Sequence, residues 1–532
     1  MTPPTLPGAD DVLRFAFSQG PGRDFVATLG PPERPLTTSF GLLPAGARTD
    51  RVHPLVSGSV DLLEATPYPA ICNDKGLTVT ERWQHAAVMA FGLQRREPAN
   101  LFNDHRSSAS VRSRFPVHPF VQTDDDAWYL DVYRHGLLPL GEAPAEVPDE
   151  GRLRLALAGR YTHLPSLYGR LRGPLVELEL GIGLRNLWVA LEVFGLRGRL
   201  WLPGAVAHKP GPLEAALYPP GEWTSVLTIE FDDAAAHGSA GPAPRRRPAR
   251  GEAPPRDPFP TWCAPARGYD PTGERGEGTP RFDDPTLDEA AAVHRSALAT
   301  ASHWGAGTAG GAQGVPASLT PSILSWGEVL WRRSAGHMPR QLPGFSGRRR
   351  PLSKTAVDDA AAWVSARPPT LLLATVAEQI QISVCLQDVA GYRTGWYRLR
   401  NEGPDGGPEL ELRRADPSLP AYLEACYGHR LSPQAGCAVR HAAMTWVLSA
   451  DVASLIERFG PGGWTLAQYA CGWMVHGLCL SAAVHGCYAR PTRAFDEVLL
   501  HPVVGTAPGE MVLLSVVMGT GRFVEPALDL RT

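Results

Sequence analysis

Two stretches of this chain, LELGIGLRNLWVALEVFGL (178–196) and YACGWMVHGLCLSAAVHGC (469–487), decide how it is organised. Each repeats apolar side chains at the i, i+3 and i+4 spacing and carries further apolar residues off that stripe, which is typical of a helix buried on all sides. Small residues such as Gly181, Gly472 and Gly477 allow two such helices to approach closely. A plain core helix explains either stretch taken alone.

The same two stretches align with each other at an offset of 291 residues and without a gap. Identical or similar residues coincide at several pairs of positions: Gly181 and Gly472, Leu187 and Leu478, Ala190 and Ser481, and Gly195 and Gly486. The match extends back to Tyr168 and Phe459, each followed by Gly, and so covers about 28 positions. A match of this length favours duplication of one domain over chance.

Short apolar runs of strand length accompany each buried helix. They are AWYLDVY (127–133) and SVLTIEF (225–231) in the first half, and QISVCL (381–386), GWYRLR (395–400) and MVLLSVVMG (511–519) in the second. Runs of about 4 to 8 residues rich in β-branched and aromatic side chains predict strands. Each half is therefore expected to be an α+β domain with a mostly antiparallel sheet flanked by helices.

A stretch rich in Pro, Gly and Arg separates the halves. It contains GSAGPAPRRRPARGEAPPRDPFP, where Pro fixes φ and few large apolar side chains offset the entropy cost of ordering. We therefore expect a flexible linker whose arginines are solvated. Asp284 followed by Pro285 then predicts the start of a helix. The predicted organisation is a first domain at 1–233, a linker at 234–284 and a second domain at 285–532.

Composition excludes several classes of function. The 532 residues carry 51 basic and 54 acidic side chains, a net charge of -3, which gives no reason to expect a nucleic-acid partner or a charged membrane surface. Residues 1–30 show no signal pattern and no run approaches the ~20 apolar residues that span a bilayer, so a cytoplasmic protein is expected. The cysteines form no CxxC pair and are expected to be reduced thiols rather than disulfides or metal ligands: Cys72, Cys263, Cys385, Cys426, Cys437, Cys471, Cys479 and Cys487.

The second half resembles the nitroreductase superfamily at three separated places. The resemblance is carried by a helix that ends in a basic-basic-Ser run, a loop after the long helix, and a basic residue after the last strand. These positions are Arg332, Arg333 and Ser334 in GEVLWRRSAGHM, Thr492, Arg493 and Ala494 in HGCYARPTRAFDEVLL, and Arg522 in SVVMGTGR. The family has a further basic residue where this chain has Gly336. The resemblance implies that the guanidinium and hydroxyl groups bind the FMN phosphate, while the loop offers backbone donors to the flavin ring.

The first half resembles a different part of the superfamily, the Ser-rich loop of SagB-type dehydrogenases. HRSSASVRSRFPVHPFV (105–121) matches the family's Arg-Pro-Ser-Ala-Gly loop at four positions, with Ser where the family has Pro and Gly: Arg106, Ser108, Ala109 and Ser110. The following AWYLDVY matches the family's Gly-x-Tyr-x-Tyr strand. The first half lacks the Arg-Arg-Ser helix and the terminal Gly-x-Gly-Arg, whereas the second has RPPTLLLATV in place of the Ser-rich loop.

These partial matches complement each other. In the family, FMN lies at a dimer interface, where one subunit gives the phosphate-binding helix, the ring-side loop and the terminal basic residue, and the other gives the Ser-rich loop. The resemblance therefore implies tandem nitroreductase-like domains that form an intrachain pseudo-dimer. One complete FMN site per chain would be divided between the halves, and the equivalent second site would have decayed. The alternative interpretation of the Ser-rich stretch is an ordinary polar loop.

A dehydrogenation also needs a group that removes a proton within reach of the substrate. The SagB-type enzymes carry Lys-Tyr before the long helix, and this chain has Leu167-Tyr168 in the first half and Arg458-Phe459 in the second. Tyr168 is therefore the candidate for proton transfer, although a structural core Tyr is equally compatible with the sequence. As a base it would need a lowered pKa, from a cation such as Arg170 or Arg172. The other candidates are three histidines, for each of which the sequence favours a structural role over a catalytic one: His163, His476 and His485.

The pattern over the full length resembles the azoline dehydrogenases of thiopeptide and similar peptide natural-product pathways, which oxidise peptide thiazolines to thiazoles. The resemblance implies a peptide substrate, other peptide-modifying enzymes as partners, and either a monomeric pseudo-dimer or a homodimer. Two other classes stay open: an NAD(P)H-dependent reductase of nitro compounds or quinones, and a non-catalytic scaffold subunit of a peptide-modifying complex. Flavin content separates a scaffold from an enzyme, and NADPH consumption with a nitroaromatic separates a reductase from a dehydrogenase.

Overall fold

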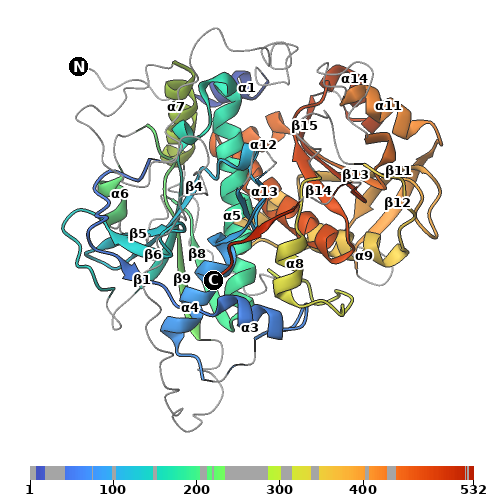
Figure 1. The fold of residues 1–532 in the computed structure, drawn as a ribbon. Helices are drawn as coiled ribbons and strands as arrows, with labels where there is room; N and C mark the ends of the chain where they lie inside the picture. Colours follow the sequence, from blue (N-terminus) through green and yellow to red (C-terminus); the bar gives the residue numbers. More distant parts are fainter. Residues whose placement is uncertain are drawn as a thin grey trace.

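The fold was obtained as a computed structural model (Figure 1). It describes residues 7–17, 42–72, 74, 76–98, 104–147, 153–203, 212–217, 221–233, 285–300, 314–336, 347–401, 407–427, 439–507, 509–521, 523 and 526–532. The predicted linker at 234–284, the linker cysteine Cys263, and Cys437 and Arg522 lie outside the described residues.

The first half is built on a seven-stranded sheet with the order β1-β6-β5-β4-β7-β9-β8, in which every neighbouring pair is antiparallel. Its strands are β1 (His53–Pro54), β4 (Val117–Gln122), β5 (Ala127–Asp131), β6 (Gly136–Pro139), β7 (Arg154–Gly159), β8 (Leu196–Trp201) and β9 (Leu227–Asp233). The accompanying helices are α1 (Ala9–Phe17), α3 (Ser59–Ala65), α4 (Val79–Phe91), α5 (Arg172–Val193) and α6 (Pro212–Ala216), with 3-10 turns η1 (Val111–Ser113), η2 (Tyr161–His163) and η3 (Ser166–Leu171).

The second half repeats this plan with a six-stranded antiparallel sheet of order β12-β11-β10-β13-β15-β14. Its strands are β10 (Gln381–Leu386), β11 (Gly395–Arg400), β12 (Glu409–Ala415), β13 (Met444–Asp451), β14 (Tyr488–Thr492) and β15 (Glu510–Gly519). Its helices are α7 (Pro285–Thr300), α8 (Trp326–Arg332), α9 (Lys354–Ser365), α10 (Leu371–Ala377), α11 (Leu419–Cys426), α12 (Val452–Phe459), α13 (Gly462–Val484) and α14 (Glu497–Val504), with the 3-10 turn η6 (Val439–His441).

The long helices α5 and α13 pack against each other between the two sheets, and their side chains join one hydrophobic core that runs through both halves (Figure 1). A Cβ on Gly181 would lie 2.2 Å from the carbonyl oxygen of Tyr469, and a Cβ on Gly472 would lie 2.0 Å from that of Leu178. Tyr469 follows Leu178 by the same offset that separates the two glycines. The contact is therefore reciprocal, as at a two-fold interface, and the chain forms an intrachain pseudo-dimer.

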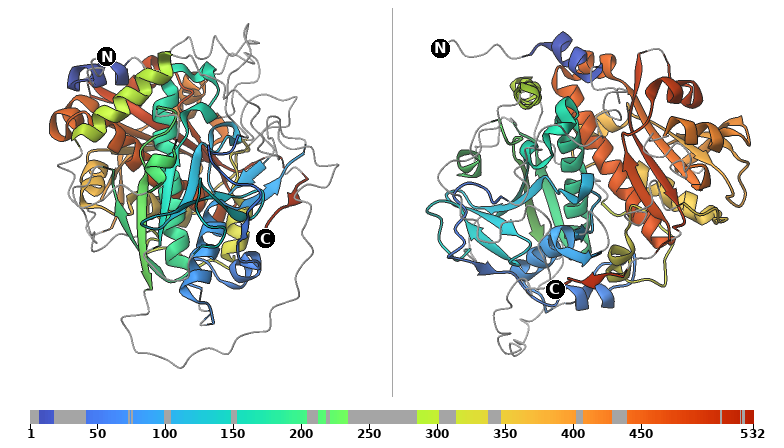
Figure 2. Two further views of the ribbon diagram at one scale, coloured as in Figure 1. Left: turned by 90° about the vertical axis from the view of Figure 1, so that its left-hand side faces the viewer. Right: turned by 45° about the horizontal axis from the view of Figure 1, so that its top comes forward.

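The end of the second half crosses to the first. Strand β16 (Leu528–Asp529) pairs antiparallel with β2 (Leu93–Arg96), and β2 pairs with β3 (Asp104–Arg106) in a separate three-stranded sheet. The Val60 amide also donates to the Thr532 carbonyl at 3.1 Å. Figure 2 shows this segment, in dark red, beside the blue elements of the first half.

The periodic stretches of the sequence form the predicted elements. Both long helices and the predicted strands are present, and α7 begins at Pro285. The α+β architecture with mostly antiparallel sheets is therefore confirmed. The sheet of the first half spans His53 to Asp233 and that of the second spans Gln381 to Gly519, whereas the predicted domain boundaries stay predictions.

Six cysteines in the described part of the chain are free thiols, as predicted: Cys72, Cys385, Cys426, Cys471, Cys479 and Cys487. A search of the described helices for one long and apolar enough to cross a bilayer gives no candidate.

Candidate functional site

The phosphate-helix residues of the second half meet the Ser-rich loop of the first half. Helix α8 starts with a capping box between Ser325 and Glu328, and Arg333 follows its last residue. The buried Arg333 guanidinium donates through Nε and Nη2 to the Arg106 carbonyl, at 3.2 and 3.0 Å. Burial lowers the pKa of Arg333 to about 10. Two candidate residues 227 positions apart in sequence are thus in direct contact.

Arg332 and Ser334, on either side of Arg333 in the sequence, are more exposed to solvent than Arg333. Arg332 is exposed and lies 3.6 Å from the Glu328 carboxylate, so its guanidinium remains accessible. The Ser334 hydroxyl accepts a hydrogen bond from the Gly336 amide at 3.1 Å. Gly336 has φ +66°, and a Cβ there would lie 2.5 Å from the ring of Tyr488. The chain carries Gly where the family has a basic residue because this backbone and this ring leave no space for a side chain.

The Ser-rich loop is held along α5 by hydrogen bonds. Ser107 Oγ donates to the Met89 and Ala90 carbonyls and accepts from Asn186 Nδ2 at 2.9 Å. The candidate residues next to it are the half-buried Ser108, the buried Ala109, and Ser110, whose hydroxyl accepts from the Phe115 amide at 2.8 Å. The Arg106 guanidinium lies 4.2 Å from the Phe115 ring centre. These contacts fix the loop in one conformation.

Glu179 is a titratable residue at this loop that the sequence reasoning missed. It lies on α5 and accepts from the Val111 amide at 2.8 Å through Oε1. Burial raises the pKa of Glu179 to about 7, and the hydrogen bonds from Val111 and Ser110 lower it only partly. The signal in the sequence is a carboxylate within a helix that is apolar nearly all round, because such a group must be partnered or neutral.

Glu179 should make stability depend on pH. The unfolded chain loses this proton near pH 4.5, the ordinary pKa, while the folded chain keeps it until about pH 7. Between these pH values the folded state binds more protons, so the free energy of unfolding falls as pH rises, by roughly 3 kcal/mol in total. Glu179→Gln keeps an acceptor for Val111 and cannot ionise, so it should remove this loss.

Urea unfolding of the parent and of Glu179→Gln at pH 5 and pH 8 measures the difference. The exposed Glu378→Gln is the matched control and should follow the parent at both pH values. A parent and a Glu179→Gln variant with the same pH dependence would contradict this account.

Tyr168 lies in η3, buried to 7% exposure, with the Arg112 guanidinium 5.6 Å from its ring centre. Burial raises the pKa of Tyr168, and the nearby Arg112 only partly counters it. Arg170, one of the cations considered in the sequence, instead pairs with Glu289 at 2.6 Å. The lowered pKa that a phenolate base requires is therefore not provided by this environment, and Tyr168 stays protonated near neutral pH.

The loop after β14 places a charged group inside the protein. Thr492 Oγ1 accepts from the Ala494 amide at 3.0 Å, so that amide is used within the loop. Arg493 is buried, and its Nη1 and Nη2 have no hydrogen-bond partner among the described residues. Burial lowers the pKa of Arg493, while Glu497 and Cys471 oppose that shift. An unpartnered buried guanidinium is costly, which points to a ligand at this loop.

Other orphaned polar groups lie along α13 beside this loop. The side-chain amide of Gln468 is fully buried and has no partner among the described residues. It stands one turn from Cys471, the thiol that interacts with Arg493. Arg333 interacts with Cys479, two turns further along the same helix. The two guanidinium groups that the FMN hypothesis needs therefore lie beside one helix, α13, and the orphaned groups fit a polar ligand of that kind.

The histidine alternatives have different surroundings. His485 Nε2 lies 2.8 Å from the Asp359 carboxylate. His163 is buried and its pKa is lowered to about 3 by burial. His476 on α13 is fully buried, and neither ring nitrogen has a partner among the described residues. Burial holds the pKa of His476 well below its ordinary value, so it stays neutral.

Comparisons with known proteins identify the fold. No family model matches the chain, and no curated protein matches it. A protein of Anabaena variabilis described as a nitroreductase superposes with a TM-score of 0.59 at 13% identity, over 96% of this chain and 99% of that chain. At this identity the likeness shows the fold alone: the chain has the nitroreductase fold.

Two further solved structures overlap only in part. One is a nitroreductase from Desulfitobacterium hafniense with bound FMN, with a TM-score of 0.22 at 13% identity over 37% of this chain and 92% of that chain. The other belongs to the Escherichia coli microcin synthetase McbBCD complex with truncated pro-MccB17 bound, with a TM-score of 0.27 at 14% identity over 35% of this chain and 71% of that chain. Their TM-scores are too low for any conclusion about this chain.

Proposed function

We propose that this protein binds one FMN between its halves and oxidises azoline rings of a peptide, thiazolines to thiazoles, in the biosynthesis of a modified peptide. The observation that carries the proposal is the contact of Arg333 with the Arg106 carbonyl. It joins the residues that the resemblance assigns to opposite sides of one flavin site. The orphaned guanidinium of Arg493 supports a bound anionic or polar cofactor beside them.

In this proposal each half supplies a different set of contacts. The phosphate is held by Arg332, Arg333, Ser334 and Arg522, and the ring and its chain by Arg106, Ser108, Ala109, Ser110, Thr492, Arg493 and Ala494. A bound FMN would supply the hydride acceptor for this oxidation, with O2 as the final oxidant. The residues of the chain orient the cofactor and the peptide and exclude water from between them.

The companion proton of the dehydrogenation needs an acceptor. Tyr168 is protonated, whereas Glu179 has a pKa of about 7 and its charge interacts with that of Tyr168. We propose that the Tyr168 hydroxyl, which keeps its own proton, positions the substrate, and that the ionised fraction of Glu179 is the base that takes up the companion proton. Tyr168→Phe should then retain flavin and lose turnover.

The first experiment is an absorbance spectrum of the purified chain, with the released chromophore identified by mass. We expect about one FMN per chain. Incubation with a thiazoline peptide and O2 should then remove two hydrogen atoms per ring. A protein that cannot be reconstituted with FMN would support the scaffold alternative, and NADPH-dependent reduction of a nitroaromatic without thiazoline oxidation would support the reductase.

Removing either proposed phosphate ligand should weaken FMN retention. Because a hydrogen bond to a charged group contributes about 1.5–3 kcal/mol, Arg332→Ala and Arg522→Ala should each lower FMN affinity roughly tenfold or more. The exposed pair of Arg332 with Glu328 contributes little to stability, so Arg332→Ala should fold as the parent does. Fluorescence titration of the apoprotein measures the affinity, with the exposed Arg367→Ala as control. Normal affinity in both variants would refute this phosphate site.

A further inference from the structure

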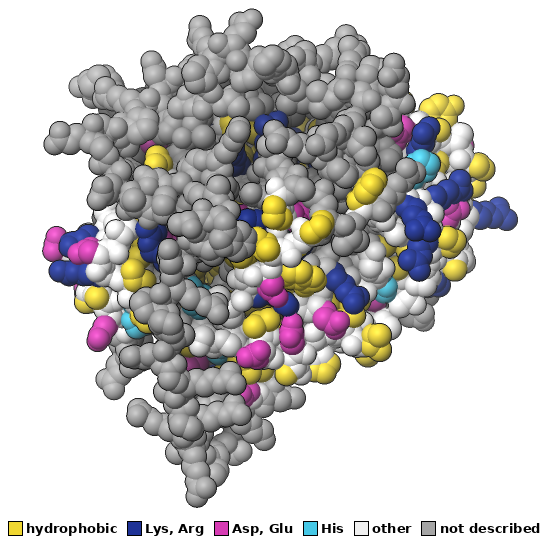
Figure 3. Space-filling view, viewed as in Figure 1, with side chains coloured by type: hydrophobic (Ala, Val, Ile, Leu, Met, Phe, Trp, Pro, Cys, Tyr) yellow, Lys and Arg dark blue, Asp and Glu magenta, His cyan; other side chains and the backbone are white. Residues whose placement is uncertain are grey.

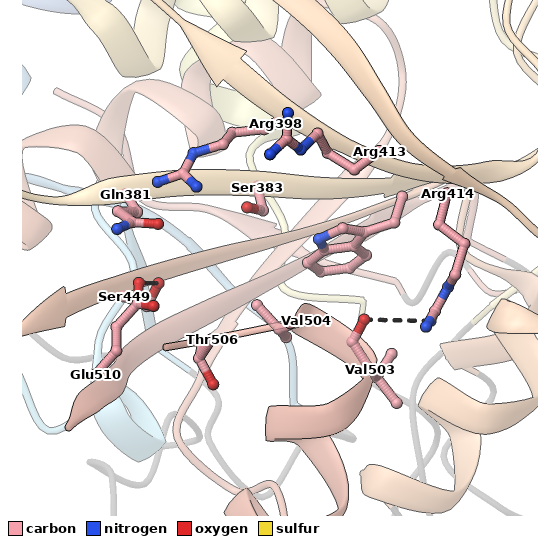
Figure 4. Close-up of a pocket in the computed structure, with 12 residues that line it drawn as sticks. Gln381, Ser383, Arg398, Arg413, Arg414, Ser449, Val503, Val504, Thr506 and Glu510 are labelled. Atoms are coloured by element: carbon pink, nitrogen blue, oxygen red, sulfur yellow. Dashed lines mark hydrogen bonds between the residues drawn. The ribbon is translucent and has the colours of Figure 1, made fainter. Parts of the chain in front are cut away.

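A polar cavity of about 230 Å³ lies in the second half, away from α13. The sheet of this half packs α13 on one face, and on the other it packs α11 and α14, where Trp396 joins Leu423 and Leu500 in a separate core. The cavity opens on this second face. Five strands, β10 to β13 and β15, and the end of α14 supply its lining, which includes Gln381, Ser383, Arg398, Arg413, Arg414 and Glu510 (Figure 4).

The charges around the cavity are predominantly positive. Arg398, Arg413 and Arg414 lie along one side, against the single carboxylate of Glu510 (Figure 4). Both oxygens of Glu510 are already occupied, Oε1 by the Ser449 hydroxyl at 2.7 Å and Oε2 by the Ala507 amide at 2.8 Å. Glu510 therefore holds the cavity wall, and its one negative charge stands against three arginines.

Several donors in the cavity have no internal partner. Arg413 bonds Glu411 at 2.8 Å and Arg414 bonds the Val503 carbonyl at 3.2 Å, but Arg398 has no hydrogen bond or ion pair with any described residue. The Gln381 and Ser383 side chains are also unpartnered within the described part of the chain, although Ser383 is only 7% exposed. The buried Ser383 hydroxyl and the Arg398 guanidinium, which are paired across β10 and β11, can therefore both donate hydrogen bonds to an anion.

On the surface outside the cavity, basic side chains outnumber acidic ones along β11 and β12, where four arginines stand against Glu409 and Glu411. Figure 3 shows Lys and Arg side chains, in dark blue, gathered over the edge of the molecule where Figure 1 places β11 and β12. These strands carry Arg398 and Arg400, and Arg413 and Arg414, respectively. Clustered positive charge draws anions toward such a cavity.

We propose that this cavity binds a small molecule through a carboxylate or phosphate group, which Arg398 and Ser383 hold. The cavity is smaller than the pockets of about 300–1,000 Å³ that bind drug-sized molecules, so its ligand should be smaller than these. The proposal rests on the second sheet alone and is independent of the flavin site.

The test is calorimetric titration of the full chain, loaded with FMN where it retains FMN, at constant ionic strength. The probes are phenyl phosphate and benzoate, with neutral benzamide as the uncharged counterpart. We expect saturable binding of at least one anion, and the tighter one identifies phosphate or carboxylate as the natural group. Absence of saturable binding for both anions, or equal binding of benzamide, would overturn the proposal.

Variants locate the ligand. Arg398→Gln should weaken binding at least about tenfold, since it removes a charge-assisted donor, and Ser383→Ala should weaken it by several-fold. The exposed Arg367→Gln makes the same charge change elsewhere and should stay within about twofold of the parent. Thermal unfolding checks that each variant is folded. Unchanged affinity in both Arg398→Gln and Ser383→Ala, or an equal loss in Arg367→Gln, would place the ligand outside this cavity.

Discussion

Gly472→Ala should destabilise the folded chain by about 4 kcal/mol or more, enough to deplete the native state. The added methyl would lie 2.0 Å from the Leu178 carbonyl oxygen and 2.8 Å from the Gly181 Cα, which are backbone atoms of the facing helix. Backbone cannot turn aside as a flexible side chain can, so α5 and α13 must separate along the whole interface between the halves. Urea unfolding followed by tryptophan fluorescence measures the loss.

The expected loss of stability in Gly472→Ala is informative because helix propensity alone predicts a gain. Ala in place of Gly within a helix stabilises it by about 1 kcal/mol when nothing opposes the methyl group. Gly407→Ala, outside any helix and just before β12, is the control for a methyl group without a steric neighbour, since a Cβ there meets no atom of the described residues within 4 Å. If Gly472→Ala were as stable as the parent, the close packing of the two long helices would be wrong.

Arg493→Met should lower FMN affinity by roughly 100-fold and at the same time stabilise the apoprotein. The guanidinium of Arg493 is buried with both terminal nitrogens unpartnered among the described residues, so in the apoprotein it contributes a desolvation cost that the charge of Glu497 offsets only in part. Met fills a similar volume without charge, and replacement of buried charges by apolar side chains often stabilises by about 1–4 kcal/mol. Affinity falls because two charge-assisted hydrogen bonds to the ligand are lost together.

These two opposite changes distinguish a ligand-binding arginine from a structural one. Thermal unfolding of the apoprotein should show the gain, and fluorescence titration with FMN should show the loss. Arg185→Met is the matched control: its guanidinium is equally buried, but it donates to the Trp363, Trp473 and Gly314 carbonyls. That variant should lose stability as an apoprotein. A loss of apoprotein stability in Arg493→Met, with FMN affinity unchanged, would show that Arg493 is structural.

The sequence predicted the parts of the fold that depend on periodicity. The two helices are apolar nearly all round, and the predicted strands 381–386 and 395–400 match the observed strands to the residue. These predictions succeed because the apolar side chains of each segment indicate by themselves that the segment is buried. The offset of 291 residues correctly paired Gly181 with Gly472, which face each other across the interface. Only internal repetition could give that contact from one chain.

The candidate site was less predictable because its features depend on neighbours distant in sequence. The contact of Arg333 with Arg106 follows from folding of the two halves together, and so does the ring of Tyr488 that excludes a side chain at Gly336. The raised pKa of Glu179 depends on its burial against the Ser-rich loop. Burial, rather than residue type, decides which of these groups is charged, and a single sequence does not specify burial at one position.

The crossing of residues 526–532 onto the first half has a consequence for behaviour on dilution. Sites built between separate subunits disappear when the protein concentration falls below the dissociation constant of the dimer. Here the two contributors are one molecule, and directly after β16 the Leu530 amide donates to the Gln94 carbonyl at 3.1 Å across the junction. The effective concentration of one half around the other is therefore fixed by the chain and independent of how much protein is present. Assembly of the interface between the halves should be as complete at nanomolar as at micromolar protein.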